Sequence, residues 1–440
     1  MESEVLAPVH ILTPLAGIAL GAVLIFSYSV LGRWLGHWAL TAPIMFMLVG
    51  WAGASLIGVA PAQVELLKVL AEATLALVLF TDAAGVRPRQ IGDDRGPVAR
   101  LLFIALPLTI VAGVAVAALL FPTMPWPALL LVAAMLAPTD AALGAATVLN
   151  PKVPVRIRRI LNVESGLNDG LATPVVLFAI AAWAGQEGLS PKDSAVAAVV
   201  EIVLGVVYGV IVGFGGGRLL RIASTRHLVT RRGAMVAVLM MPLIAYTVAG
   251  LFDGNGFIAA FVAGTAYAAA WRGEDGHPML DAAETIAEPM GDATWLIFGV
   301  LVVPLLLVDL SWQEVAFAVL SLTVLRMVPV ALSLLGTGFR PPTLAFIGWF
   351  GPRGLASVVF SLIALESLEI DESLRDVLGT ATLTIFASVV LHGVSARWGA
   401  NSYAAWARRT KPKQETAEAE EPRPYGRTAS AISEATVTGG

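Results

Sequence analysis

The chain has 440 residues, of which 57% are hydrophobic and only 14% are charged, and its mean hydropathy is +0.79. A soluble domain carries roughly 25% charged residues, so this composition excludes a large soluble enzyme and indicates a polytopic membrane protein. The small net charge of -4, without a basic patch, argues against nucleic-acid binding, and the lack of Cys excludes disulfides and thiolate metal sites.

Thirteen segments meet the criterion for a membrane-spanning helix, which is about 20 mostly apolar residues. They are residues 9–31, 38–58, 64–84, 98–121, 127–149, 159–183, 194–220, 233–251, 255–271, 290–309, 312–335, 342–366 and 375–396. We therefore expect an all-α polytopic membrane protein with 13 transmembrane helices. Residues 1–396 would form the transmembrane domain, and residues 397–440 a polar tail with a short amphipathic piece followed by disorder.

The distribution of basic residues predicts the orientation of these spans. With thirteen spans, 23 of the 28 Lys and Arg residues fall on one side of the membrane, and only Lys192 and Arg375 fall on the other. Because basic loops stay in the cytoplasm, we predict an external N-terminus and a cytoplasmic tail, in the plasma membrane. One helix missed or added would move the later loops to the wrong side and remove this bias.

Two predicted spans contain helix breakers at mid-length. The fifth contains Pro138-Thr139-Asp140, and the twelfth contains Gly351-Pro352-Arg353-Gly354. Pro removes a backbone donor and Gly weakens a helix, and a broken helix at membrane depth is tolerated only where it lines a cavity or is buried in protein. Interrupted helices at corresponding positions of two inverted halves mark the binding site of a transporter.

The sixth predicted span carries Glu164, Ser165, Asn168 and Asp169. Their spacing of four residues places them on one stripe of the helix, and carboxylates at membrane depth usually face an ion path. Asp169, Ser165 and the unwound backbone around Thr139 offer the oxygen ligands that a hard cation such as sodium prefers. A partly desolvated carboxylate can hold either a proton or a cation near neutral pH, which is the chemistry of an antiporter.

The residue types also predict the stoichiometry. Asn168 cannot titrate, so Asn168 and Asp169 together offer one exchangeable charge. Glu164 is expected to be neutralised by Arg353, because a lone guanidinium at membrane depth needs a partner. One cation replacing one proton gives an electroneutral 1:1 exchange.

Four stretches resemble the monovalent cation/proton antiporter-1 family, which contains the NhaP-type and NHE-type sodium/proton exchangers. They are Ala137–Asp140, Asn162–Gly170, Gly351–Gly354 and Gly254–Ala260. The last has Asn255 where Ser is usual, and Ala141 stands where the family usually has Pro, so Pro138 is expected to supply the break. The likeness covers all thirteen predicted spans and leaves out the tail.

The resemblance implies an NhaA/NhaP-like antiporter fold with an inverted-repeat core. It also implies a homodimer in which a core domain, including residues 98–183 and 312–396, moves against a dimerisation domain. In the site that the resemblance implies, Asp169 is the carboxylate that binds the ion and the proton, and Asp169, Ser165 and Thr139 bind Na+. In this implied site Asn168 gives polar support, Asp140 lies at the helix crossing, and Asp82 lies near the ion site. Glu164 and Arg353 are implied to form a structural ion pair. No cofactor is expected besides the transported Na+ and H+, and membrane lipid and a second copy are the expected partners.

Several alternatives stay open or can be ranked. Potassium/proton or broader monovalent cation exchange stays open, because selectivity depends on cavity size and ligand number. A channel would lack uphill exchange. An intramembrane aspartyl protease would place its acids in Tyr-Asp and Gly-x-Gly-Asp contexts, whereas Thr precedes Asp140 and Asn precedes Asp169. Asp169 could also be a polar helix contact only, and His392 is expected to be a satisfied core residue.

Overall fold

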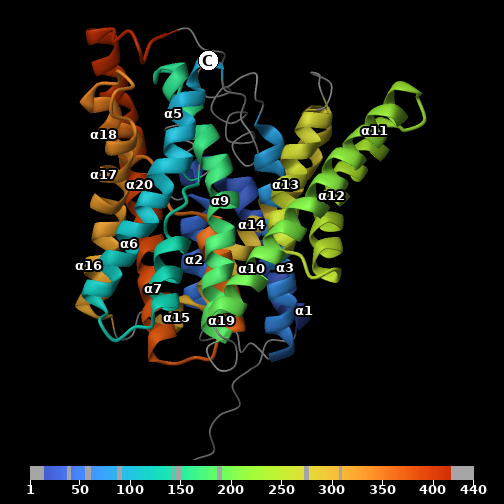
Figure 1. Cartoon of the computed structure of the whole chain (residues 1–440), viewed down its shortest axis with the longest axis horizontal. Helices are drawn as coiled ribbons and strands as arrows, with labels where there is room; N and C mark the ends of the chain where they lie inside the picture. Colours follow the sequence, from blue (N-terminus) through green and yellow to red (C-terminus); the bar gives the residue numbers. More distant parts are fainter. Residues whose placement is uncertain are drawn as a thin grey trace, which may run out of the picture.

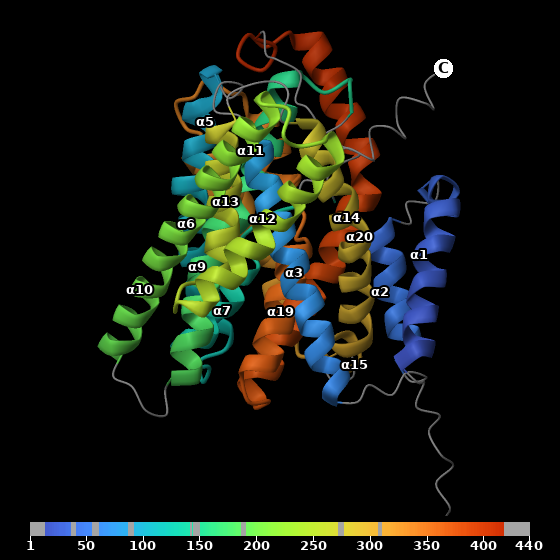
Figure 2. The ribbon, with the colours of Figure 1, turned by 90° about the vertical axis from the view of Figure 1, so that its right-hand side faces the viewer.

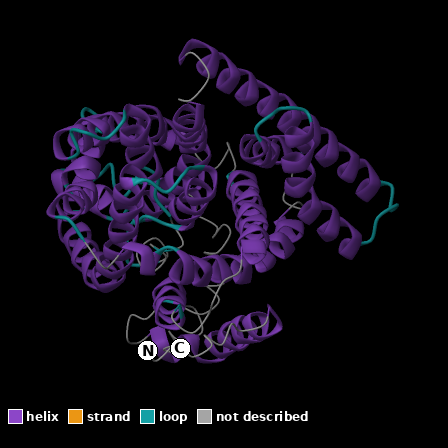
Figure 3. Cartoon of the chain, turned by 90° about the horizontal axis from the view of Figure 1, so that it is seen from below, coloured by secondary structure: helices purple, strands orange, loops and turns teal. Residues whose placement is uncertain are grey.

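The computed structural model describes residues 14–36, 41–54, 61–86, 92–140, 143, 150–185, 191–271, 277–306 and 310–417. These residues form helices and loops and contain no strand (Figure 3). In chain order the helices are α1 Pro14–Gly36, α2 Ala42–Gly53, α3 Pro61–Gly85, the 3-10 turn η1 Gly92–Asp94, α5 Arg95–Arg100, the π-helical η2 Leu101–Ala105, α6 Leu106–Leu120, α7 Trp126–Met135, α9 Val155–Ala184, α10 Pro191–Val210, the π-helical η4 Ile211–Gly215, α11 Gly216–Thr225, α12 Arg231–Leu251, α13 Gly256–Ala270, α14 His277–Leu301, α15 Val303–Leu306, α16 Trp312–Leu322, α17 Val324–Ser333, α18 Pro341–Trp349, α19 Leu355–Ser367 and α20 Glu372–Thr410.

The helices are apolar enough for a membrane. In the described part of the chain, six continuous helical runs are long and apolar enough to cross one: Arg95–Leu120, Val155–Ala184, Val196–Thr225, Arg231–Leu251, Trp312–Ser333 and Glu372–Thr410. Valines on the outer face of α10, such as Val199 and Val203, are exposed, as expected for a helix that meets lipid. Each predicted span overlaps a described helix, so the all-α membrane fold is confirmed, while the number of crossings stays a prediction.

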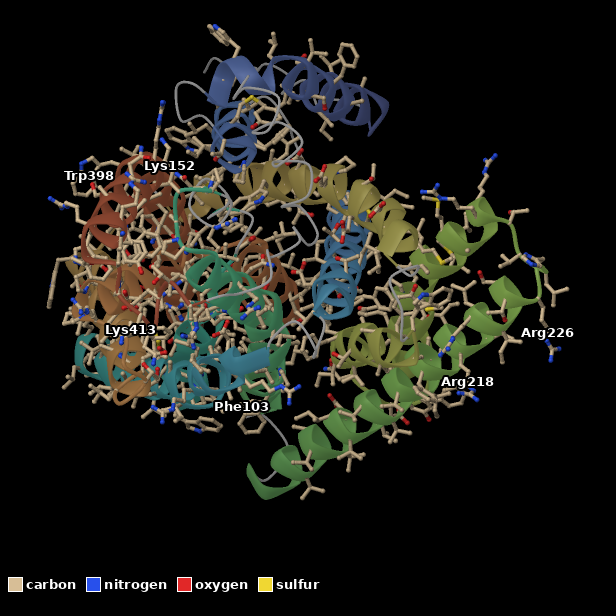
Figure 4. All side chains as sticks on the ribbon, turned by 90° about the horizontal axis from the view of Figure 1, so that it is seen from above. Phe103, Lys152, Arg218, Arg226, Trp398 and Lys413 are labelled. Carbon is tan, nitrogen blue, oxygen red and sulfur yellow. The ribbon has the colours of Figure 1, made fainter. Side chains whose placement is uncertain are left out.

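The helices form two groups that lie side by side (Figures 1 and 4). In the first group α7 packs on α6 and α9, α20 packs on α7 and α16, and α17 packs on α18. In the second group α13 packs on α3, α10 and α12, and α14 packs on α2, α3 and α12. The groups meet where α3 contacts α9 and α19 and where α14 contacts α19 (Figure 2).

Both predicted breaks interrupt their helices. The helix α7 ends at Met135, and residues 136–140 continue it as a non-helical stretch. Pro138 cannot donate a backbone hydrogen bond and disfavours a helical conformation for the residue before it, which explains an end just upstream. Between α18 and α19, residues 350–354 are likewise non-helical. Ala141 lies outside the described residues.

The helix that carries the predicted tenth span begins before that span. We placed the span at residues 290–309, and α14 begins at His277. The first half of α14 carries Asp281, Glu284 and Glu288, and these acids lower the local hydropathy without preventing a helix. Glu284 is nevertheless buried by the neighbouring helices.

The first part of the predicted tail, from residue 397, is helical. The helix α20 continues to Thr410, and Tyr403 and Ala407 on its last turns are buried. Beyond α20, the buried carboxylate of Glu415 accepts hydrogen bonds from the Arg340 backbone N–H and the Thr343 hydroxyl, both at 2.8 Å. The segment just after residue 396 is therefore part of the packed bundle, and residues 418–440 lie outside the described residues.

Candidate functional site

The two helix breaks cross each other in the first group of helices. The Asp140 backbone N–H donates to the Pro352 carbonyl at 2.8 Å. The Asp140 carboxylate accepts from the Leu355 backbone N–H at 3.2 Å, which caps the start of α19. In return, the Ser357 hydroxyl of α19 donates to the carbonyl of Met135, the last residue of α7, at 2.6 Å. Each break thus satisfies backbone groups that the other leaves free.

Two glycines allow the breaks to approach this closely. A Cβ atom on Gly354 would collide with the side chain of Asp140. A Cβ atom on Gly351 would lie 2.8 Å from Thr139 Cγ2 and 2.9 Å from Arg326 Nε. Since real side chains do not reach such distances, the crossing requires Gly at both positions.

A polar cluster joins the break after α7 to the stripe on α9. Thr139 Oγ1 lies 3.1 Å from Ser165 Oγ and accepts a hydrogen bond from Asn168 Nδ2 at 2.8 Å. Asn168 Nδ2 also lies 3.3 Å from Glu164 Oε1. All four side chains are buried, and Asp169 beside them is only 6% exposed. The buried Asn168 Oδ1 has no hydrogen-bond partner among the described residues.

The ion partner predicted for Glu164 was wrong. The carboxylate of Glu164 binds Arg326 of α17 in a bidentate pair, with N–O distances of 2.9 and 3.0 Å. Arg353 instead donates to the carbonyls of Gly351 at 2.8 Å and Ser321 at 3.0 Å. Its guanidinium therefore donates to carbonyls near the interruptions of two helices and not to a carboxylate, and its buried Nε has no hydrogen-bond partner among the described residues.

Arg326 is the site residue that we did not assign from the sequence. It lies inside a predicted span, as Arg353 does, and a buried guanidinium there signals a buried acid. By residue type, either Arg326 or Arg353 could pair with Glu164. Only the positions of the two arginines in the folded chain show which one does. The short interruption between α16 and α17 at Thr323, where φ is -116° and ψ is -92°, helps to set the position of Arg326.

The second group of helices meets the stripe through α3 and α13. A Cβ atom on Gly166 would lie 3.7 Å from the Asp82 carbonyl oxygen, so Asp82 of α3 lies beside α9 next to Ser165. A Cβ atom on Gly170 would collide with the ring of Phe261 of α13. Asp82 therefore lies near the polar cluster, on the opposite group of helices, and it is partly exposed.

The stretch Gly254–Ala260 forms the start of α13. Asn255 Oδ1 accepts a hydrogen bond from the Ile258 backbone N–H at 3.1 Å and so caps the helix. Asn and Ser are about equally good at this position. The presence of Asn255 where Ser is usual therefore preserves the local structure.

The chemistry of the cluster suits a hard cation. The hydroxyls of Thr139 and Ser165 converge, and the Asp169 carboxylate follows Ser165 by one helical turn. Oxygen ligands of this kind bind cations such as sodium rather than transition metals. Within the described ranges, no group of three or more His, Cys, Asp or Glu side chains could hold a metal ion.

Comparisons with known proteins identify the family of the chain. The family model for the transmembrane sodium/hydrogen exchanger matches residues 19–401. The Na(+)/H(+) antiporter 2 of Zygosaccharomyces rouxii is 26% identical over 317 residues, which are 63% of this chain and 38% of that protein. The K(+)/H(+) antiporter NhaP of Alkalimonas amylolytica is 26% identical over 84% of this chain and 62% of its own length. The chain thus spans less than two thirds of these two relatives.

Two further proteins are covered over more of their length. The Na(+)/H(+) antiporter NhaP of Pseudomonas aeruginosa is 28% identical over 76% of this chain and 80% of that protein. The solved structure of the sodium proton antiporter MjNhaP1 from Methanocaldococcus jannaschii superposes with a TM-score of 0.71 at 16% identity. That alignment covers 89% of this chain and 99% of the other, and at this low identity it shows the fold alone.

Proposed function

Because the chain belongs to the sodium/hydrogen exchanger family, we propose that it is a secondary-active antiporter in which Na+ and H+ compete for the Asp169 carboxylate. The contact between the Thr139 and Ser165 hydroxyls, at 3.1 Å and one helical turn from Asp169, carries this proposal. These oxygens would hold the cation while Asp169 is ionised. Protonation of Asp169 would remove the negative charge and release the cation.

The buried charges support an electroneutral 1:1 exchange. Among the described residues at the crossing, Arg326 and Arg353 supply two guanidiniums, and Asp140, Glu164 and Asp169 supply three buried carboxylates. One carboxylate is therefore in excess. Glu164 is paired with Arg326, and the Asp140 carboxylate accepts from the Leu355 backbone N–H. We assign the exchange of one cation for one proton to Asp169.

The cycle that we propose moves the first group of helices, as a core domain, against the second group, as a dimerisation domain. One contact between the groups is the ion pair of Lys68 on α3 with Glu366 on α19, at 2.6 Å. Lys68 also lies 3.9 Å from Glu72 on its own helix. Movement of the groups past each other would separate Lys68 from Glu366 but not from Glu72.

Potassium/proton exchange is the second candidate. The relative from Alkalimonas amylolytica, matched over 84% of this chain, is named a K(+)/H(+) antiporter. The proposed ligands Thr139, Ser165 and Asp169 are all oxygens, which bind either cation. Ligand number and cavity size would set the preference.

We further propose a homodimer in the plasma membrane with a cytoplasmic tail. The loop-charge bias supports this orientation, and Arg218 and Arg226 project outward from the α11–α12 hairpin (Figure 4). The exposed apolar side chains of α10, such as Val203, leave a surface for lipid or for a second copy.

The testing experiment is ion exchange by the purified chain in proteoliposomes. An imposed sodium gradient should drive proton movement in the opposite direction, without chloride dependence and without net current. Equal responses to sodium and potassium would remove the sodium preference but keep antiport. Downhill flux with no uphill exchange would indicate a channel, and a net current would contradict the 1:1 stoichiometry.

A further inference from the structure

One face of α20 holds the non-helical stretch between α18 and α19. Ser388, His392 and Ser395 lie on this face because they are spaced by four and three residues. The Arg353 backbone N–H donates to Ser388 Oγ at 2.8 Å, and His392 Nε2 lies 2.7 Å from the Trp349 carbonyl oxygen. The Trp349 indole N–H donates to Ser395 Oγ at 3.0 Å. Trp349 directly precedes residues 350–354 and Arg353 is the last but one of them, so α20 contacts the stretch near both ends.

The ring of His392 occupies the centre of these contacts. It is 2% exposed and stacks on the indole of Trp349, with ring centroids 5.2 Å apart and an interplanar angle of 29°. Its Nδ1 lies 3.2 Å from Ser388 Oγ and 2.7 Å from the Ser388 carbonyl oxygen. Both ring nitrogens are therefore within hydrogen-bonding distance of partners.

The chemistry of these partners limits where the hydrogens lie. The carbonyl oxygens of Trp349 and Ser388 only accept, so each is bound only by a ring nitrogen that carries a hydrogen. Each lies 2.7 Å from one ring nitrogen. Ser388 Oγ accepts from the backbone N–H of Arg353. One chain of contacts thus runs from Arg353 through Ser388 and His392 to Trp349.

The stretch that this chain holds forms one wall of the candidate site. Gly351 packs against Thr139 and Arg326 so closely that no side chain fits between them. The Pro352 carbonyl accepts from the Asp140 backbone N–H at 2.8 Å. A shift of residues 350–354 would therefore move Thr139 and Asp140 as well.

We infer that His392 is a positioning residue for the cation site, an inference that rests on the proposed function. It touches neither the cation nor Asp169. It fixes the non-helical stretch against which Thr139 packs, and so holds the Thr139 hydroxyl at the distance from Ser165 that a bound cation requires. Outer residues that orient the ligands of an ion change its affinity about 10–100-fold when they are replaced.

The test measures cation affinity and stability in the same full-length variants. His392→Ala should raise the apparent KM for sodium about tenfold and change kcat less. His392→Gln should restore most of the affinity, because its amide N–H can donate to the Trp349 carbonyl as the ring does. Ser395→Ala is the matched control, since it loses a contact with Trp349 but leaves the chain through His392 intact, and its KM should stay within about twofold of the wild type.

Several outcomes would overturn the inference. A folded His392→Ala variant with lower thermal stability and an unchanged KM would give His392 a structural role only. An equal rise in KM for Ser395→Ala would contradict the specific chain. If His392→Ala does not fold, the KM for sodium and the thermal stability of Ser388→Ala are measured instead, and an unchanged KM in that folded variant would overturn the inference.

The proposed function can fail separately from this inference. If the wild type does not exchange ions, sodium-induced thermal stabilisation of the wild type and the variants still measures the site. Loss of that stabilisation in His392→Ala but not in Ser395→Ala would support the positioning role without antiport. If neither sodium nor potassium stabilises the wild type, both the function and the inference are wrong.

Discussion

Glu164 and Arg326 form a bidentate ion pair in the protein interior, with N–O distances of 2.9 and 3.0 Å and exposed side-chain fractions of 1% and 2%. The pair ties α9, which carries the polar stripe, to α17. The charge of Glu164, one of the two acids on that stripe, is neutralised by Arg326. Asp169 is the other acid on that stripe, and it is the carboxylate that we propose exchanges the cation and the proton.

The first prediction concerns this pair. Arg326→Met should destabilise the protein by about 3–5 kcal/mol, because it leaves the buried Glu164 charge without a partner. The double variant Glu164→Leu with Arg326→Met should lose less than the sum of the two single changes. Thermal unfolding in detergent measures both, and a single-variant loss below about 1 kcal/mol would contradict a buried pair of this kind.

The second prediction concerns the cap that Asp140 provides. Asp140→Ala removes the acceptor for the Leu355 backbone N–H and should cost about 1 kcal/mol. Asp140→Asn keeps a side-chain oxygen at this position and should lie close to the wild type in stability. Similar unfolding temperatures for the Ala and Asn variants would mean that the cap contributes nothing.

The third prediction concerns the close approach of the two breaks. Gly354→Ala should destabilise the chain by about 1–3 kcal/mol or more and reduce transport, because its Cβ would collide with Asp140. Gly250→Ala on α12 is the control, since a Cβ there meets nothing within 4 Å. Exchange by Gly354→Ala at the wild-type rate would show that the two helix breaks can move apart without loss of transport, and would contradict this prediction.

The fourth prediction tests relative movement of the two groups of helices. The chain has no native Cys, so Lys68→Cys with Glu366→Cys introduces one reactive pair between α3 and α19. A short bifunctional thiol reagent should join them and stop exchange. The control pair, Lys68→Cys with Glu72→Cys, lies on α3 alone, and its cross-linking should leave exchange unchanged.

Cross-linked Lys68→Cys/Glu366→Cys protein that transports at the uncross-linked rate would contradict the proposed movement. Neutralising the ion pair has a smaller expected effect. Both side chains are partly exposed, at 28% and 35%, and such pairs contribute about 0–1 kcal/mol. Glu366→Gln should therefore change the rate by no more than about fivefold.

Much of the crossing was predictable because backbone chemistry is local. Pro138 stops a helix wherever it lies, and the spacing of Ser165 and Asp169 places both on one face. These two rules were enough to predict that a broken helix and a polar stripe form the candidate site. They do not show that Thr139 would meet both Ser165 and Asn168, which depends on how α7 packs against α9.

The unpredicted features depend on packing between distant segments. Arg326 and Arg353 are the same residue type, and both lie inside predicted spans. Only the positions of α17 and of the non-helical stretch show that Glu164 pairs with Arg326. His392 has Ser388 and Ser395 on its own helix face, and neither spacing indicates its contact with Trp349. The early start of α14 was hidden by its acids, of which Glu284 is buried and Asp281 is exposed.

The central claim is that Asp169 binds the exchanged cation and proton, and one substitution tests it most directly. Sodium-driven proton movement is measured in proteoliposomes for the wild type, Asp169→Asn and Asp281→Asn, where Asp281 is an exposed acid on α14. We predict that Asp169→Asn abolishes exchange while remaining folded, and that Asp281→Asn exchanges at the wild-type rate. Exchange by folded Asp169→Asn at the wild-type rate would contradict the claim.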